Sequence, residues 1–434
     1  MKILRYAAAV ICLALPAHAA VDIQKVTSPG GITAWLVEEH AIPFTALELR
    51  FLGGTSLDPE GKRGAVNLMA ATLEEGAGDL DAQGFAAARD RLAARFGFSS
   101  DADAVSVSAQ FLTENRDEAV DLLRQAIIQP RFDDSAIARV RGQVLSGIAA
   151  DAQDPDAIAN RTFSSDVFGN HPYGSDASGT AESVSALTRD DLVAAHKATM
   201  AQDNIYVAAA GDITPTELGT LLDRLLGDLP AKAAEGPGDA DWQADGDTHV
   251  VDFPTPQSVV QFGQPAPAVD DPDFMAAFTL NEIVGGGRFT ARLMDELRTK
   301  RGLTYGAYSQ LASMEHGSFL AGRFASDNAN VGEAVSLVRE QWEKLAQDGV
   351  TQQELDAAKT YLTGAYPLRF DGNGPIASIL VSMQMQGFPV DYPQKRNEMI
   401  EALTLEDVNR VARELYDPEA LHFVVVGQPK GLEN

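Results

Sequence analysis

The chain has 434 residues, of which 45% are hydrophobic, and its 34 Lys and Arg residues face 62 Asp and Glu residues. The formal charge of -28 would repel nucleic acid and an anionic membrane surface, so neither is expected as a partner. The apolar fraction is too high for a disordered acidic chain, and 37 glycines and 21 prolines exclude a collagen-like one. A folded protein of two or three domains is therefore expected.

Residues 1–19 are typical of a secretory signal peptide. A basic start precedes an apolar run at 7–15, and Ala-His-Ala at 17–19 is a small-residue cleavage signal, so we expect cleavage before Ala20 and export. The run is too short for an ordinary membrane span, and no later stretch approaches the ~18 apolar residues that a span requires. Cys12 is the only cysteine and lies in this segment, so the mature chain would have neither disulfides nor thiolate metal sites.

The hydrophobic pattern after the signal peptide alternates between the periods of strands and helices. Gly30-Gly31 separates two strand-like runs and predicts a hairpin. Strict alternation of apolar residues predicts strands at 47–51 and 105–111. Longer periodic segments predict helices at 64–75, 82–96, 116–129 and 134–150. Such a mixture predicts an α+β fold.

A repeat relates two distant parts of the chain. Residues 187–211 and 403–427 align without a gap, at a constant offset of 216. In each, a threonine (Thr188 or Thr404) is placed to cap a helix, and acidic residues follow in the first turn. Each helix leads to an apolar strand closed by glycine, and the surrounding order of elements also agrees. The repeat therefore predicts two similar α+β halves in tandem.

The segment between the halves, residues 231–247, gathers Ala, Gly, Pro and Asp and has no hydrophobic periodicity. We interpret it as a linker. The expected organisation is a signal peptide at 1–19, an N-terminal half at 20–230, the linker, and a C-terminal half at 248–434.

Common catalytic and ligand-binding motifs are missing from the sequence. Gly285, Gly286 and Gly287 precede a helix, but neither a Gly-Lys-Ser/Thr sequence nor a dinucleotide fingerprint follows, which favours a flexible or close-packed loop over a phosphate site. No two histidines lie three to five residues apart, and there is no Gly-x-Ser-x-Gly elbow. Scattered acidic residues that bind another metal remain a minor alternative, which metal analysis would decide.

Two segments carry a resemblance to a known family. Residues 53–76 read GGTSLDPEGKRGAVNLMAATLEEG, and residues 293–305 read LMDELRTKRGLTY. Both resemble the pitrilysin/insulinase-type zinc metallopeptidases (inverzincins), a family that includes the mitochondrial processing peptidase subunits. The resemblance covers nearly the whole mature chain, from residue 21 to about 429. It implies two tandem α+β halves, each a mixed or antiparallel sheet with helices on one side, which close as a clamshell around unfolded peptides. It also favours the periplasm as the compartment.

The resemblance places unsuitable residues at the family's zinc site. Its members carry H-x-x-E-H on a helix, where two histidines bind zinc and the glutamate activates water. Asn67, Ala70 and Ala71 stand at these three positions. Alanine has no ligand atom, and an asparagine amide is a poor match for zinc. The family's third ligand, a later glutamate, would fall near residues 143–148, which contain no glutamate. We therefore expect no metal in this chain.

A second pair of family residues is kept. The family places an arginine and a tyrosine seven residues apart in its second half, near the zinc, and Arg298 and Tyr305 match them. Apolar residues at every fourth position predict a helical stripe here, made of Phe289, Leu293 and Leu297. Arg298 would then lie in the last turn, Gly302 would end the helix, and Tyr305 would fall early in the next strand. The alternative is a surface arginine and a half-buried strand tyrosine without a function.

Two functions remain open for such a chain. In the first, it is the metal-free subunit of an exported heterodimeric zinc peptidase, whose zinc-carrying paralogous partner binds the metal. Arg298 and Tyr305 would then bind extended peptides and stabilise the oxyanion at the partner's zinc. In the second, it is a non-catalytic peptide-binding or assembly protein that adds peptides as strands to a sheet edge. A partner with an intact zinc helix would distinguish the two.

Overall fold

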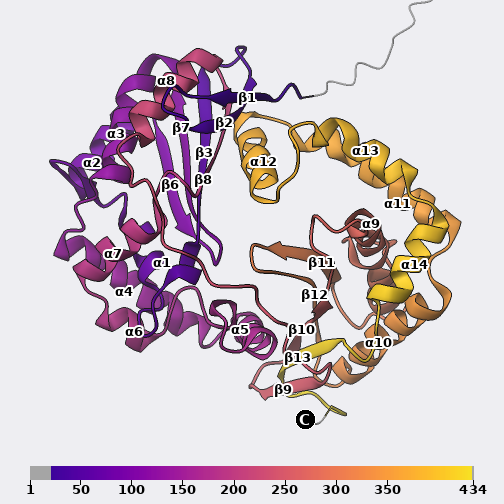
Figure 1. The fold of residues 1–434 in the computed structure, drawn as a ribbon. Coiled ribbons are helices and arrows are strands. Elements are labelled where there is room, and N and C mark those ends of the chain that lie inside the picture. The colour runs from indigo at the N-terminus through magenta and orange to yellow at the C-terminus, as the bar shows by residue number, and fades with distance from the viewer. Residues whose placement is uncertain (1–20, 433–434) are drawn as a thin grey trace, which may run out of the picture.

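The structure, a computed structural model, describes residues 21–432 and contains two large sheets. The expected signal peptide and its cleavage site lie outside the described residues. Figure 1 shows the two halves standing opposite each other, the first in indigo to magenta and the second in brown to yellow. No helix between residues 21 and 432 is both long and apolar enough to cross a membrane.

The first sheet has six strands in the order β1-β2-β8-β3-β7-β6, antiparallel except for the parallel pair β2–β8. Its strands are β1 (Gln24–Thr27), β2 (Thr33–Glu38), β3 (Phe44–Leu52), β6 (Arg95–Ser100), β7 (Ala104–Leu112) and β8 (Ile205–Gly211); β4 (Gly76–Ala77) and β5 (Leu80–Asp81) form a small separate ribbon. The predicted hairpin and both predicted alternating strands are confirmed. In β3, Leu47, Leu49 and Phe51 are buried in the core, because alternate side chains point to the same face.

The helices of the first half are α1 (Ala65–Thr72), α2 (Ala82–Arg91), α3 (Arg116–Ile128), α4 (Asp134–Asp151), α5 (Pro155–Phe168), α6 (Ala181–Ala186), α7 (Arg189–Thr199) and α8 (Pro215–Leu226), with short turns η1 (Gly54–Leu57), η2 (Thr113–Asn115) and η3 (Pro172–Gly174). The predicted helix at 82–96 is too long. It ends at Arg91, Ala93 takes a positive φ of 50°, and the chain then enters β6, the edge strand beside β7.

The second half repeats this order of elements. Its strands are β9 (Thr248–Asp252), β10 (Gln257–Pro265), β11 (Ala307–Met314), β12 (Gly317–Asp327) and β13 (His422–Gly427). Its helices are α9 (Phe274–Gly285), α10 (Val331–Asp348), α11 (Gln352–Ala365), α12 (Asn373–Met385), α13 (Tyr392–Ala402) and α14 (Leu405–Leu415), with turns η4 (Met294–Thr299) and η5 (Tyr366–Arg369).

The strand orders confirm the repeat that the sequence predicts. The second sheet, read as β9-β13-β10-β12-β11, matches β2-β8-β3-β7-β6 of the first, and in both the first of these pairs is the parallel one. The two predicted caps are also present: Thr188 accepts from the backbone N–H of Asp191, and Thr404 accepts from that of Asp407. Each aspartate carboxylate in turn accepts a hydrogen bond from the backbone N–H of its threonine, which completes a capping box.

The two halves exchange one helix each. Helix α12 of the second half packs on β8, β3 and β2 of the first sheet, and Leu380 belongs to the same buried cluster as Trp35 and Ala208. Helix α5 of the first half packs on β13 and β10 of the second sheet, and Phe163 belongs to the same buried cluster as Val424. Figure 1 shows both exchanged helices between the halves. The expected helices on one side of each sheet are therefore present, apart from the exchanged one. The other face of each sheet is covered by the helix that comes from the opposite half.

Candidate functional site

Helix α1 occupies the place that the resemblance gives to the zinc helix. Its start is fixed by Asp58, whose carboxylate accepts hydrogen bonds of 2.8 Å from the backbone N–H groups of Gly64 and Val66. These groups belong to the first turn, which has no helical partners of its own. Burial of this carboxyl raises its pKa, although the two hydrogen bonds and Arg63 oppose the shift.

The three motif positions lie on α1 but present no metal ligands. Ala70 is buried, and Asn67 and Ala71 are partly exposed. Helix α4, which carries residues 143–148, packs against α1 and brings no glutamate to it. Across residues 21–432, no group of three His, Cys, Asp or Glu side chains is placed to hold a metal. The residues present do not fit a zinc ion.

Arg298 lies on η4, a single π-helical turn of six residues. Such turns are rare in proteins overall, and those that occur are often found at functional sites. Leu293 and Leu297 are fully buried and hold the segment against the core of the second half. Gly302 has a φ of 65°, which favours glycine, and its N–H donates to the Arg298 carbonyl at 2.9 Å. The prediction that Gly302 ends the helix agrees with this geometry.

The environments of Phe289 and Tyr305 differ from the prediction. Phe289 does not continue the buried stripe: it is 62% exposed, and the guanidinium carbon of Arg298 lies 4.7 Å from the centroid of its ring. Tyr305 precedes β11, which begins at Ala307, and is 82% exposed. Tyr305 therefore lies before the strand and not early in it as predicted, and it is exposed and not half-buried. Among the described residues, the phenol of Tyr305 has no hydrogen-bond partner.

The glycine-rich loop is closely packed against its surroundings. Gly285 ends α9, and a Cβ there would lie 2.1 Å from Ser309 Oγ, so only glycine lets α9 approach β11 this closely. A Cβ at Gly286 would meet the Glu282 carboxylate at 2.3 Å, and Gly287 has a φ of 82°. Asn281 also donates to the backbone carbonyl of Ser309 at 2.9 Å. The sequence left a flexible and a close-packed loop open, and these contacts are those of a close-packed one.

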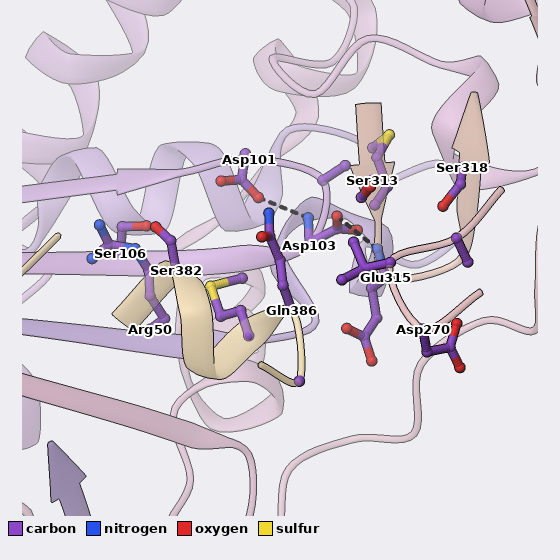
Figure 2. A pocket seen from close by; sticks show the side chains of 16 residues that line it. Arg50, Asp101, Asp103, Ser106, Asp270, Ser313, Glu315, Ser318, Ser382 and Gln386 are labelled. Atoms are coloured by element: carbon purple, nitrogen blue, oxygen red, sulfur yellow. Dashed lines mark hydrogen bonds between the residues drawn. The ribbon is translucent and has the colours of Figure 1, made fainter. Parts of the chain in front are cut away.

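A cavity of about 710 Å³ lies between the two halves. Figure 2 shows Arg50 and Ser106 of the first sheet at one side and Asp270 and Ser318 of the second half at the other. The carboxylates that line it belong to Asp101, Asp103, Asp270 and Glu315. Its one guanidinium, that of Arg50, is paired with Glu48 at 2.8 Å. No sequence motif marks this set of residues, because they come from strands and loops that lie far apart in the chain.

The wall of this cavity joins the two halves through Asp103. Its carboxylate accepts hydrogen bonds from the Tyr173 hydroxyl and, at 3.1 Å, from the backbone N–H of Glu315. Burial raises the pKa of this carboxyl above its ordinary value, against the hydrogen bonds that lower it. The hydroxyl of Tyr173 in turn accepts from the backbone N–H of His316 at 3.0 Å. The β11–β12 turn is thereby fixed to the first half.

Comparison with known proteins matches both halves of the chain to one family. Residues 35–181 match the family model "Insulinase (Peptidase family M16)", and residues 186–362 match "Peptidase M16 inactive domain". The chain belongs to the M16 family. It is a member of the inactive kind, because Asn67, Ala70 and Ala71 stand in place of the zinc motif in the half that matches the insulinase model.

The relatives include a protein named as a non-peptidase and proteins named as zinc proteases. The non-peptidase homolog YmxG of Helicobacter pylori is 28% identical over 396 residues, which cover 91% of each chain. An uncharacterized zinc protease of Mycobacterium leprae is 26% identical over 404 residues, which cover 90% of this chain and 88% of that one. The crystal structure of a peptidase M16 inactive domain from Pseudomonas fluorescens has a TM-score of 0.88 at 27% identity, and the match covers 95% of this chain and 99% of that one. A chain of complex III2 from Candida albicans shares the fold, with a TM-score of 0.78 at 15% identity over 95% of this chain and 98% of that one.

Proposed function

We propose that the protein is the metal-free subunit of a heterodimeric zinc peptidase of the periplasm. The observation that carries this proposal is the contrast between two places in the chain. Helix α1 keeps none of the metal-binding residues, whereas Arg298 and Tyr305 are both present at the surface of the second half. The Tyr305 side chain is 82% exposed and is therefore accessible to another molecule. Export is supported by the signal-like residues 1–19.

In this proposal the chain's own residues bind and orient the peptide, and a paralogous partner supplies the zinc site. The Tyr305 phenol donates a hydrogen bond to the scissile carbonyl oxygen as that oxygen becomes an oxyanion. The Arg298 guanidinium donates to a neighbouring carbonyl oxygen of the extended peptide and fixes its register. Both roles require hydrogen-bond donors that are not already occupied. Among the described residues, neither side chain is hydrogen-bonded or ion-paired to another.

The test is reconstitution of the mature chain with a related chain that carries an intact H-x-x-E-H helix. Peptidase activity is expected only in the mixture. Tyr305→Phe removes one oxyanion donor and is expected to lower kcat by about 10²–10³-fold. Tyr308→Phe is the matched control, because Tyr308 is also exposed, at 44%, and lies three residues away. Equal activity of Tyr305→Phe and the unchanged chain would overturn the role of the phenol.

A second function, peptide binding without catalysis, is favoured by the open edge of the first sheet. Strand β6 is an edge strand and, among the described strands, pairs only with β7. The corresponding edge strand β11 is partly covered, because Asn281 donates to the Ser309 carbonyl and the Ala307 N–H points at Met294. An extended peptide would therefore add to β6. Anisotropy of labelled unfolded peptides with the isolated chain tests this, and a chain that binds none of them would exclude it.

A further inference from the structure

We infer that Phe289 is a positioning residue for Arg298: its ring supports the guanidinium by one face and leaves the N–H edges free for a peptide. The inference rests on the proposed function of Arg298. The guanidinium carbon lies 4.7 Å from the ring centroid, within the distance of about 6 Å over which a cation is attracted to an aromatic face.

The Arg298 side chain has no other partner in the described part of the chain. No carboxylate lies within ion-pair distance, and no side-chain or backbone oxygen accepts from it. A carboxylate partner would occupy several of the five N–H donors of a guanidinium, whereas an aromatic face occupies none of them. The stack therefore restricts the side chain without using the atoms that a substrate needs.

The neighbouring basic residues show that this isolation is specific to Arg298. The segment 288–301 contains four other basic residues, and each is paired with a carboxylate: Arg288 with Glu282, Arg292 with Glu354, and both Lys300 and Arg301 with Glu296. In a chain with 62 acidic residues such partners are abundant. Arg298 alone in this segment has an exposed ring in place of a carboxylate.

The two members of the stack are held by separate parts of the backbone. Phe289 follows the close-packed glycine loop, in which Gly287 has a positive φ. Arg298 lies on η4, which is anchored by the buried Leu297 and by the hydrogen bond from Gly302. Because both backbones are fixed, the ring and the guanidinium meet without rearrangement when a peptide arrives, which is the meaning of preorganisation.

Arg288 provides a matched control within the same segment. Its guanidinium carbon lies 4.6 Å from the ring centroid of Tyr361, which resembles the Arg298 stack, but its Nε donates to Glu282 at 2.6 Å. Glu282 is 9% exposed. The Arg288 guanidinium is therefore already held by a carboxylate, and loss of the Tyr361 ring should leave Arg298 and peptide binding unchanged.

The first test is spectroscopic and does not depend on activity. In the full chain with 15N-labelled arginine, the Nε–H resonance of Arg298 is assigned by its loss in Arg298→Lys. We expect a ring-current shift that disappears in Phe289→Leu, persists in Phe289→Tyr, and is unaffected by Tyr361→Leu. An unchanged Arg298 resonance in Phe289→Leu would overturn the inference directly. Phe289 is largely exposed, so a thermal melt of each variant should show an intact fold.

The second test measures kcat and KM of the reconstituted heterodimer. Phe289→Leu is expected to lower kcat/KM about two- to fivefold, the effect of an exposed cation–π contact, with Phe289→Tyr retaining full activity. If Arg298→Lys lowers activity but Phe289→Leu does not, the positioning role is overturned and the proposed function stands. If Arg298→Lys and Tyr305→Phe both leave activity unchanged, the proposed function fails, whatever Phe289 does to the resonance.

Discussion

His249 donates a hydrogen bond from its Nδ1 to the Asp166 carboxylate at 2.7 Å, and this contact joins β9 of the second sheet to α5 of the first half. The same carboxylate oxygen lies 3.2 Å from Nε2 of the buried His422. The other ring nitrogen of His422 contacts Asp247 at 2.8 Å. The exchanged helix is therefore held by polar contacts as well as by the apolar core around Phe163.

This exchange predicts that neither half folds alone. A chain of residues 20–230 would expose the apolar face of its sheet that α12 covers, and residues 248–434 would lack α5 in the same way. Expressed separately, each is expected to aggregate, and co-expression is expected to recover a one-to-one complex in gel filtration. A separate half that is monomeric and unfolds cooperatively would contradict this account.

The exchanged helix α12 should contribute strongly to stability. Leu380 is fully buried in the mixed core between α12 and the first sheet. Leu380→Ala is expected to lower the free energy of unfolding by about 2–5 kcal/mol, from lost apolar burial and the remaining cavity. Leu368→Ala is the control, because Leu368 is 78% exposed, and should change it by less than about 0.5 kcal/mol. Urea denaturation of both variants measures the difference; equal values would contradict the packing described.

The link between α9 and α14 predicts a pH dependence in the acid range. Arg410 binds both carboxylate oxygens of Asp273, at 2.5 and 2.8 Å, and these hydrogen bonds hold the pKa of Asp273 below its ordinary value. The folded state therefore binds this proton less readily than the unfolded state. The stabilisation is complete above the unfolded pKa of about 3.9 and is lost as the pH falls through the lower folded pKa.

The pair is partly exposed, so its contribution to the free energy of unfolding is expected to be small. A double-mutant cycle with Asp273→Asn and Arg410→Gln, followed by urea unfolding between pH 2 and pH 7, measures it. The coupling energy should vanish at the acid end. A coupling that persists or grows there would contradict the assigned direction.

The side chains on α1 predict that metal removal has no effect on this chain. Chelation with EDTA is expected to leave Tm unchanged, because Asn67, Ala70 and Ala71 offer no set of zinc ligands. Asn67→His with Ala71→His supplies two imidazoles but no third protein ligand from α4, so this variant should bind zinc only weakly in competition with a chromophoric chelator. If the unchanged chain bound one zinc ion and its Tm fell after chelation, the interpretation that α1 offers no zinc ligands would be wrong.

Much of the fold follows from local patterns in the sequence. The alternation in β3 and β7 and the capping threonines of α7 and α14 are short-range signals, and the repeat they form predicts two matching halves. The helix exchange is different, because an amphipathic pattern shows that a helix has a buried face but not which sheet that face covers. The assignment of α5 and α12 to the opposite sheets therefore required the structure.

The candidate site was predicted only in part, for a comparable reason. Arg298 and Tyr305 follow from the family motif, yet their surroundings do not follow from spacing. Phe289 fits the period of four residues with Leu293, but the positive φ of Gly287 and the π-helical η4 break the regular helix on either side of it. The ring therefore lies outside the core and under the guanidinium. Hydrophobic periodicity assumes one continuous helix and does not detect such a break.

The most direct test of the account is affinity purification of the tagged mature chain from its native extract, followed by sequencing and zinc analysis of what it retains. If the chain is the metal-free subunit of a zinc peptidase, we expect it to retain a roughly equimolar related chain with an intact His-x-x-Glu-His helix and one zinc ion per pair. Recovery of the chain alone, or only with copies of itself and without zinc, would contradict it and favour a non-catalytic peptide-binding protein.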